Sequence, residues 1–303
     1  TKENDMLDFR IFTFLEVCKQ MNFTKAAKKL NITQPAVSQH IRWLEKEYGI
    51  KLFEMEGKKL SLTEEGDLFR NAAMTFQHDE MYLKHKIQEI KKGKRRIYFG
   101  ATLTIGDFIL PRAAAEFIKM HPDTEVSIRI ANTEDLLNQL DQGEIDFAMV
   151  EGYFEKKEYD YRIYSRESYI AVCGRDYCFQ KEPEVLEDLL SEPLITREAG
   201  SGTREIMEKS LEGRNLKIGD FKKNHEASSL HMIKKLVAEG CGITFLYEAA
   251  AGEELRDGIL RKLELKDFPV VHDFTFVWRN HSIFSQDYLD IFNSLHKDDE
   301  YTI

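Results

Sequence analysis

One stretch of the chain, residues 23–48 (FTKAAKKLNITQPAVSQHIRWLEKEY), limits what the rest can fold into. Its second half has apolar residues three or four positions apart, namely Val37, Ile41, Leu44 and Tyr48. This spacing predicts an α-helix that buries one face against a small core. Thr33 is a good cap for that helix, and Pro35 fits its first turn because a first-turn N–H needs no helical partner.

The first half of the stretch predicts a shorter helix that we expect Thr24 to cap. The small residues Ala26 and Ala27 would let the two helices cross closely, as a helix-turn-helix requires. The second helix would then present a polar outer face suited to reading DNA bases: Gln34, Ser38, Gln39 and Arg42. The alternative is an ordinary helical hairpin whose polar face is solvated.

Longer motifs favour the DNA-reading interpretation. F-T-x-A-A, T-Q-P-A-V-S, L-E-x-E-Y-G-x-x-L-F and L-T-x-x-G occur in one ungapped run from about Leu7 to Gly66. In this combination the segment resembles the N-terminal winged helix-turn-helix of LysR-type transcriptional regulators. The resemblance implies that Thr33 and Pro35 lie at the DNA together with the polar face. It also implies phosphate contacts by Thr24, Lys51, Lys58 and Lys59.

Residues 51–63 alternate and turn at 56–58, which predicts the two-stranded wing. Two positions depart from the family pattern by losing positive charge. Met55 stands where LysR-type wings usually have Arg, and Gln39 stands where Arg is common in the recognition helix. Gln39 can still pair with an adenine edge, whereas Met55 is unsuited to a phosphate contact.

Residues 63–92 predict one long helix capped by Thr63. It carries an apolar stripe: Leu68, Ala72, Phe76, Leu83, Ile87 and Ile90. Because a helix between two domains has nothing of its own to cover such a stripe, we expect a second copy of the chain to cover it. The resemblance implies the same, as a homodimer or homotetramer. The alternative is that the stripe packs onto the chain's own body.

From Ile97 onward, strands and helices alternate, which predicts an α/β sheet with parallel strands. The expected strands are 97–99, 126–130, 145–150, 169–173, 194–196, 243–246 and 275–278. We also expect Thr133 to cap a helix that runs to Gln142. The family resemblance implies a two-lobed, periplasmic-binding-protein-like effector domain. The fold class is therefore α/β, with an all-α-type N-terminal winged helix-turn-helix and a long linker helix.

We predict three parts. Residues 1–65 form the winged helix-turn-helix, residues 66–94 form the linker helix with a basic hinge, and residues 95–303 form the effector domain. Within the effector domain, lobe one would comprise 97–167 and 269–303, and lobe two 168–268. The assignment of these lobes rests on the resemblance.

Three loops follow predicted strands, where ligands bind in open α/β sheets: residues 101–104, 151–152 and 196–204. They resemble the effector-contacting loops of LysR-type regulators, especially the subgroups that control sulfur assimilation and carbon fixation. This resemblance implies the following candidate effector residues: Thr102, Thr104, Glu151, Arg197, Ser201 and Thr203. Hydroxyls, free N–H groups and one Arg suit a small anion. The alternatives are turn and capping roles for the hydroxyls, with Arg197 and Arg204 as surface ion-pair partners.

Composition sets further limits. The net charge of −10 alone would argue against a nucleic-acid partner, but the charge is unevenly distributed. Residues 1–96 carry 19 basic and 14 acidic side chains, whereas the remaining residues carry 24 and 39. This pattern is compatible with a basic reader joined to an acidic body. No signal peptide or long apolar run is visible, and we expect a cytoplasmic location.

The sequence lacks the phosphate-binding, dinucleotide, zinc-protease and nucleophile-elbow motifs, so we expect no enzyme activity, cofactor or metal. The four cysteines are most simply reduced thiols, with a redox pair of Cys173 and Cys178 as the alternative.

We therefore predict a transcriptional regulator that binds an interrupted palindrome and responds to a small effector held between two lobes. Its expected partners are promoter DNA, the effector, further copies of the chain and RNA polymerase. Two other classes remain open: a transport-type binding protein, and an α/β enzyme with an accessory DNA module.

Overall fold

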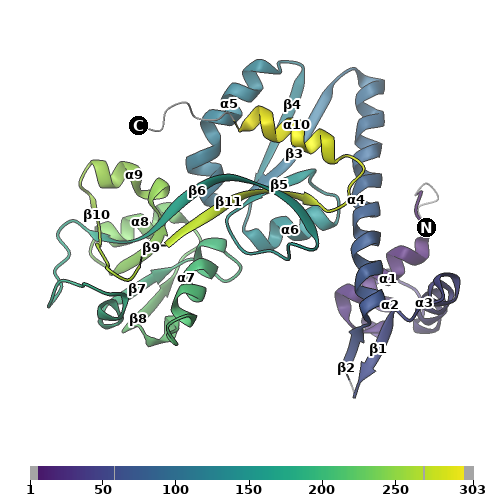
Figure 1. The fold of residues 1–303 in the computed structure, drawn as a ribbon, viewed down its shortest axis with the longest axis horizontal. Coiled ribbons are helices and arrows are strands. Elements are labelled where there is room, and N and C mark those ends of the chain that lie inside the picture. The colour runs from purple at the N-terminus through teal and green to yellow at the C-terminus, as the bar shows by residue number, and fades with distance from the viewer. Residues whose placement is uncertain (1–5, 58, 269, 297–303) are drawn as a thin grey trace. The chain divides into compact units, whose positions relative to one another are not determined.

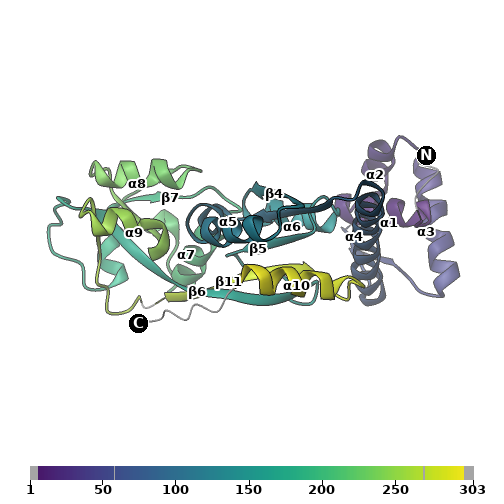
Figure 2. The same cartoon turned by 90° about the horizontal axis from the view of Figure 1, so that it is seen from above.

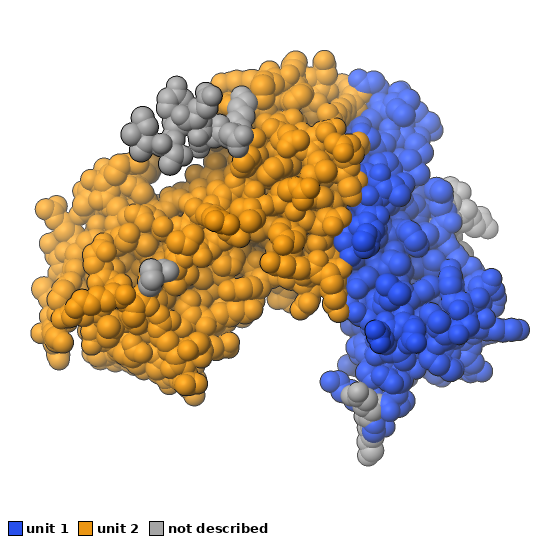
Figure 3. Space-filling view, viewed as in Figure 1, with its two compact units in different colours: residues 1–93, 141–144, 279–284 blue, residues 94–140, 145–278, 285–303 orange. Residues whose placement is uncertain are grey.

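The computed structural model forms two compact units, which Figure 3 colours separately. The residues that it describes are 6–57, 59–268 and 270–296. The first unit contains the described part of residues 1–93 together with two short segments, 141–144 and 279–284. The second unit contains the other described residues from Lys94 onward.

The first unit begins with the predicted winged helix-turn-helix. Its elements are α1 (Phe9–Gln20), α2 (Phe23–Leu30), α3 (Gln34–Tyr48), β1 (Phe53–Glu56) and β2 (Lys59–Leu62). The two strands pair antiparallel and form the wing. The predicted apolar face of α3 is confirmed for three of its four residues, because Val37, Ile41 and Leu44 lie in the core with Phe14 of α1. Tyr48, the fourth, is exposed and contacts the ring of Phe69.

The sequence predicted the cap of α3 correctly and the cap of α2 wrongly. Thr33 caps α3 as expected, because its Oγ1 accepts the N–H of Ala36 at 3.3 Å. The expected cap of α2, Thr24, is wrong. Asn22 takes that role, since its Oδ1 accepts the N–H of Lys25 at 2.9 Å. The side chain of Thr24 therefore lies exposed in the first turn of α2.

The glycine of the L-T-x-x-G motif allows the linker helix α4 (Glu64–Lys92) to start against the wing. Thr63 caps α4 as predicted, because its Oγ1 accepts the N–H of Gly66 at 2.9 Å. The N–H of Thr63 donates to the carbonyl of Leu52 at 3.2 Å. A Cβ atom on Gly66 would lie 2.1 Å from that same carbonyl oxygen, so no larger residue fits here without a backbone shift.

Two faces of α4 have different surroundings in this chain. The predicted apolar stripe is largely exposed, with exposed fractions of 72% for Leu68, 56% for Phe76 and 83% for Ile90. Of its six residues only Leu83 is partly buried. The described residues of the first unit therefore leave this stripe uncovered, and the alternative that it packs onto the rest of the chain's own body stays open.

The other face of α4 is held by polar contacts to one of the two short segments of the first unit, residues 279–284. The hydroxyl of Thr75 donates to the carbonyl of Asn280 at 3.0 Å. The carboxylate of Asp79 accepts the Ile283 N–H at 3.0 Å and is bonded by the Ser282 hydroxyl at 2.5 Å. Thr75, Asp79 and Ser282 are buried, and buried polar contacts of this kind fix a helix in one position.

The second unit is built on a nine-stranded sheet in the order β4-β3-β5-β11-β6-β9-β7-β8, with β10 pairing to β6. Its strands are β3 (Arg95–Ala101), β4 (Thr124–Ile130), β5 (Phe147–Val150), β6 (Tyr159–Gly174), β7 (Pro193–Thr196), β8 (Lys223–Glu226), β9 (Ile243–Tyr247), β10 (Leu260–Lys262) and β11 (Val270–Arg279). Its α-helices are α5 (Leu110–Met120), α6 (Thr133–Asp141), α7 (Gly202–Glu212), α8 (Leu230–Ala238), α9 (Glu248–Arg256) and α10 (Ser285–Leu295). Short helical turns lie at 105–109, 186–191 and 218–220.

Parallel pairing occurs at both ends of this sheet, as the alternation of strands and helices predicts. β3 pairs parallel with β4 and β5, and β7 pairs parallel with β8 and β9. The two long strands β6 and β11 lie side by side in the middle and join the two halves (Figures 1 and 2). Their pairings to β9 and β5 are antiparallel. The sheet is therefore mixed, not purely parallel.

The two central strands are longer than the sequence pattern indicates. The expected strand 169–173 is only the buried end of β6, whose first ten residues are mostly polar and partly exposed. Likewise 275–278 is the buried end of β11. The predicted lobe boundary at 167 falls inside β6, and the domain boundaries as a whole stay predictions. In the part of the chain that the structure describes, no helix is long and apolar enough to cross a membrane.

We expect Gly66→Ala to destabilise the winged helix-turn-helix by about 1–3 kcal/mol, because the new methyl group overlaps the Leu52 carbonyl. Thermal unfolding followed by circular dichroism measures this change. Gly252→Ala in α9 is the matched control, since a Cβ there meets nothing within 4 Å. Equal melting temperatures for Gly66→Ala and wild type would contradict the close approach.

Candidate functional site

The predicted base-reading face of α3 is accessible in the structure. Gln34, Gln39 and Arg42 are exposed, and Ser38 is partly exposed. The amide of Gln34 donates to the Ser38 hydroxyl at 2.9 Å, so these two side chains are already oriented on one face. Amide, hydroxyl and guanidinium groups are those that pair with base edges in the major groove.

The predicted phosphate contacts are also at the surface. Thr24, Lys51 and Lys59 are exposed, whereas Lys58 lies outside the described residues. Lys51 forms an ion pair with Glu45 at 3.1 Å, yet its side chain remains 76% exposed. Sequence reasoning missed three exposed lysines of α2, which the K-A-A-K-K pattern signals: Lys25, Lys28 and Lys29.

All six predicted effector residues are buried in the second unit, each at most 5% exposed. They come from three loops, as predicted: the residues after β3, after β5, and between β7 and α7. The N–H of Thr102 donates to the carbonyl of Met149 at 3.0 Å, which ties the first loop to β5. The Tyr169 hydroxyl donates to the carbonyl of Thr203 at 2.7 Å and fixes the start of α7.

Direct contacts bring these loops into one place. The Thr203 hydroxyl donates to Oε1 of Glu151 at 2.6 Å. A Cβ atom on Gly202 would lie 2.7 Å from the backbone nitrogen of Gly152 and 2.8 Å from Oγ1 of Thr133. Two glycines are thus required where the loops touch. We call this set the polar cluster: Thr102, Thr104, Thr133, Glu151, Arg197, Ser201 and Thr203.

Thr133 belongs to the polar cluster although sequence reasoning assigned it to capping α6. That assignment is wrong, because Oδ1 of Asn132 accepts the N–H of Asp135 at 2.8 Å and caps the helix. The Thr133 hydroxyl is buried beside Gly152 and Gly202 instead. The N-T-E pattern at 132–134 offers two residues that can cap, and only the fold decides between them.

Most members of the polar cluster have a buried polar atom without a hydrogen-bond partner in the described chain. These atoms are Oγ1 of Thr102, Thr104 and Thr133, Oγ of Ser201, Oε2 of Glu151 and Nη1 of Arg197. The capping alternative for Ser201 is wrong, because its hydroxyl makes no bond to α7. Each such atom costs about 1–3 kcal/mol when it stays unsatisfied, so the cluster is suited to a polar ligand.

Three helical runs begin at the polar cluster. They are residues 103–120, α6 and α7, which start next to Thr102, Thr133 and Ser201. The first N–H groups of a helix lack helical partners and carry a partial positive charge. Together with the hydroxyls they form a site that favours acceptor atoms or negative charge.

Arg197 is buried rather than a surface residue, contrary to the alternative interpretation. Its Nε and Nη2 both donate to the carboxylate of Glu198 at 2.8 Å, so this bidentate pair takes up most of its charge. Arg204 does behave as an ion-pair partner. It contacts Glu208 at 2.8 Å and Glu226 at 2.6 Å.

Glu151 is the titratable group of the polar cluster. Burial has the largest effect and raises the pKa of its carboxyl above the ordinary value of 4.5. The hydrogen bond from Thr203 opposes this effect most, and smaller contributions come from Thr104, Arg197 and Thr102. The hydroxyls of Thr102 and Thr104 are thus near Glu151, although neither makes a hydrogen bond of regular geometry.

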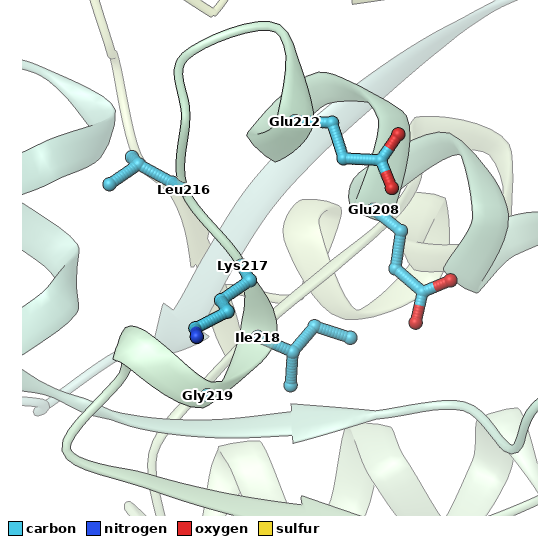
Figure 4. A pocket seen from close by; sticks show the side chains of 6 residues that line it. All are labelled: Glu208, Glu212, Leu216, Lys217, Ile218 and Gly219. Atoms are coloured by element: carbon cyan, nitrogen blue, oxygen red, sulfur yellow. The ribbon is translucent and has the colours of Figure 1, made fainter.

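A separate cavity of about 230 Å³ lies at the C-terminal end of α7 (Figure 4). Its lining residues are Glu208, Glu212, Leu216, Lys217, Ile218 and Gly219, none of which belongs to the polar cluster. Among the described residues, no group of three or more His, Cys, Asp or Glu side chains could hold a metal ion.

Comparison with known proteins identifies the family. Residues 10–67 match the bacterial regulatory helix-turn-helix protein model of the lysR family, and residues 91–287 match the LysR substrate binding domain. The chain belongs to the LysR-type transcriptional regulators. It is 31% identical over 284 residues to the transcriptional activator CmpR of Synechocystis sp., with 91% of each chain covered.

Solved structures show the same fold. An OxyR mutant of Corynebacterium glutamicum superimposes with a TM-score of 0.60 at 23% identity, covering 95% of this chain and 91% of that one. The regulatory domain of Synechocystis CcmR, solved with 2-PG, matches with a TM-score of 0.58 at 24% identity. That match covers 68% of this chain and 99% of the CcmR domain. This LysR-type regulator therefore has a DNA-binding domain and an effector-binding domain.

The raised pKa of Glu151 predicts a pH-dependent stability. A carboxyl whose pKa is higher in the folded state contributes stability that is complete below the unfolded value of 4.5 and is lost as pH rises through the folded pKa. Glu151→Gln has no carboxyl group and cannot lose stability in this way. The melting temperature of Glu151→Gln minus that of wild type should therefore increase from pH 4.5 to pH 8.

Thermal unfolding of both proteins across this range measures the difference. Glu253→Gln, at an exposed position of α9, is the control and should show a constant difference from wild type. A pH-independent difference between Glu151→Gln and wild type would contradict the assignment.

Proposed function

We propose that this LysR-type regulator binds an interrupted palindrome in promoter DNA as a homo-oligomer, and that a small anion in the polar cluster controls it. The observation that carries the proposal is the gathering, where three helices begin, of six buried polar atoms that have no hydrogen-bond partner among the described residues. Proteins leave so many polar atoms unsatisfied in one place chiefly at sites for ligands. A cytoplasmic location and a contact with RNA polymerase stay predictions.

The DNA-reading part of the proposal rests on the exposed face of α3. Gln34, Gln39 and Arg42 would contact base edges, while exposed lysines beside them neutralise phosphates. One such helix reads only a few base pairs. Two copies of the chain would read two half-sites about one or more helical turns apart, which gives the interrupted palindrome.

The exposed stripe of α4 supports self-association. Phe76 and Ile90 are 56% and 83% exposed although both are large and apolar, and they lie on the same face as Leu68. Covering such a face removes apolar area from water at about 25 cal/mol per Å². A second α4 offers a complementary surface of the same kind.

We expect Phe76→Glu to weaken self-association at least tenfold, because it places a charge in the apolar contact. Sedimentation velocity across a concentration series measures the monomer fraction. Gln88→Glu is the control, since it adds the same charge at another exposed position of α4. Unchanged association of Phe76→Glu would contradict a contact through this stripe.

An anion suits the polar cluster because donors outnumber charged acceptors there. Thr102, Thr104, Thr133 and Ser201 each offer a hydroxyl, and Nη1 of Arg197 offers an N–H. The three helix starts add backbone N–H groups with a partial positive charge. Ser201 has no base bonded to its hydroxyl, so we propose no catalytic role for it.

We expect Ser201→Ala and Thr102→Ala to abolish the response to the anion while DNA affinity stays within a few-fold of wild type. Fluorescence anisotropy with the promoter region upstream of its own gene, across a salt series, measures DNA affinity. Sulfate, inorganic phosphate and 2-PG are added in parallel, and Ser228→Ala, at an exposed loop position, is the control.

Two results would count against the proposal. Wild-type affinity for the promoter equal to that for random DNA would remove the DNA-reading role of α3. Loss of DNA binding in Ser201→Ala or Thr102→Ala would contradict the separation of reader and effector site.

A further inference from the structure

The charge of the polar cluster depends on one side chain, Glu151. Its carboxyl group is 1% exposed, with Oε1 bonded by the Thr203 hydroxyl at 2.6 Å. Its other oxygen, Oε2, is buried without a partner in the described chain, beside the unpartnered hydroxyls of Thr102 and Thr104. A ligand in the cluster would therefore meet Oε2 directly.

The positive charge of Arg197, the buried cation of the polar cluster, does not neutralise an ionised Glu151. Arg197 is bound through two nitrogens to Glu198, so the pair is close to neutral. Nη1 of Arg197, an NH2 group, has no hydrogen-bond partner in the described chain and is left as a donor for the cluster. Ionisation of Glu151 would thus give the cluster a net negative charge.

The other ionisable groups around Glu151 do not change this balance. Burial raises the pKa of Tyr169 on β6 and of Tyr247 on β9 well above the ordinary value, so both phenols stay neutral. On α7, Arg204 is held by Glu208 and Glu226. Further titratable groups on the adjoining elements include Glu134 and Asp135 of α6, Glu205 and Lys209 of α7, Asp107 after the first loop, Tyr153 after β5, Glu167 of β6 and His272 of β11. The charged side chain that shifts the pKa of Glu151 is Arg197.

The two protonation states of Glu151 favour different ligands. When ionised, Oε2 is an acceptor that repels an anion at close range in a buried site. When protonated, the same oxygen can donate a hydrogen bond, and the cluster becomes neutral with donors on every side. An oxyanion bound here would therefore require the protonated form.

We propose that the effector anion binds together with one proton, which resides on Oε2 of Glu151 and is donated as a hydrogen bond to an oxygen of the anion. The inference rests on the proposed function, because it specifies how the same site accepts its anion. The proton comes from solvent and no covalent bond of the ligand is made or broken. Glu151 thereby selects oxyanions that present an acceptor oxygen at this position.

Proton uptake makes the affinity depend on pH. Above the pKa of Glu151 in the free protein, each additional pH unit lowers the affinity for the anion by up to about tenfold. Glu151→Gln removes this dependence, because its amide donates a hydrogen bond at every pH and has nearly the same shape.

Isothermal titration calorimetry of the full chain with sulfate tests the proposal. Sulfate stays fully ionised between pH 5 and pH 8, so any proton taken up on binding must go to the protein. Titrations in two buffers of different ionisation enthalpy give the number of protons. We expect uptake that approaches one proton per sulfate in wild type, and none in Glu151→Gln with affinity retained.

A second variant keeps the test independent of how Glu151→Gln folds. The hydroxyl of Thr203 lowers the pKa of Glu151 through its hydrogen bond, so Thr203→Val should move the pH at which sulfate affinity falls to a higher value. The comparison of wild type with Glu151→Gln also separates Glu151 from His272, whose ring contacts Tyr153.

Each outcome has a distinct meaning. Sulfate binding without proton uptake, or uptake that Glu151→Gln leaves unchanged, overturns this inference while the anion site stands. If sulfate, inorganic phosphate and 2-PG all fail to bind wild type and Glu151→Gln at pH 5.5, the anionic effector itself is wrong and this inference falls with it.

Discussion

The hydrogen bond between the Thr203 hydroxyl and Glu151 joins the two halves of the effector domain at the polar cluster. It joins the loop after β5 to the start of α7, which belong to opposite halves of the sheet. The contact is possible only because Gly152 and Gly202 let the two backbones approach, since a Cβ on Gly202 would lie 2.7 Å from the Gly152 nitrogen. Burial raises the pKa of Glu151 above its ordinary value, and the hydrogen bond from Thr203 opposes this effect.

One helix carries the chain from the polar cluster into the first unit. α6 starts with Thr133 in the cluster and ends at Asp141, which lies within the first unit. Asp141 accepts a bond of 2.8 Å from the fully buried Arg279, the last residue of β11. Arg279 also donates to the carbonyl of Asn71 on α4 at 3.2 Å. The central strand β11 and α6 therefore end at the same buried ion pair on the linker helix.

The helix caps show where a local sequence pattern no longer predicts the structure. The sequence offers a Thr near the start of α2 and of α6, and in both places a preceding Asn forms the cap. The displaced threonines are then available for other contacts: Thr24 at the surface of the reader, and Thr133 in the polar cluster. Both residue types cap well, so their propensities cannot choose between them, and only the fold shows which one caps.

The sequence by itself determined the winged helix-turn-helix, the linker helix, the alternation of strands and helices, and the three loops that form the polar cluster. These follow from helical spacing, glycine positions and motifs that act over a few residues. Only the tertiary structure decided that β6 and β11 are long antiparallel strands, because their half-exposed polar ends carry no periodic signal. It alone also paired Arg197 with Glu198 and buried Glu151 and Thr133 together. Burial depends on residues far apart in the chain, so no local pattern reports it, and the adjacent pair of Arg197 and Glu198 becomes a buried one only in the fold.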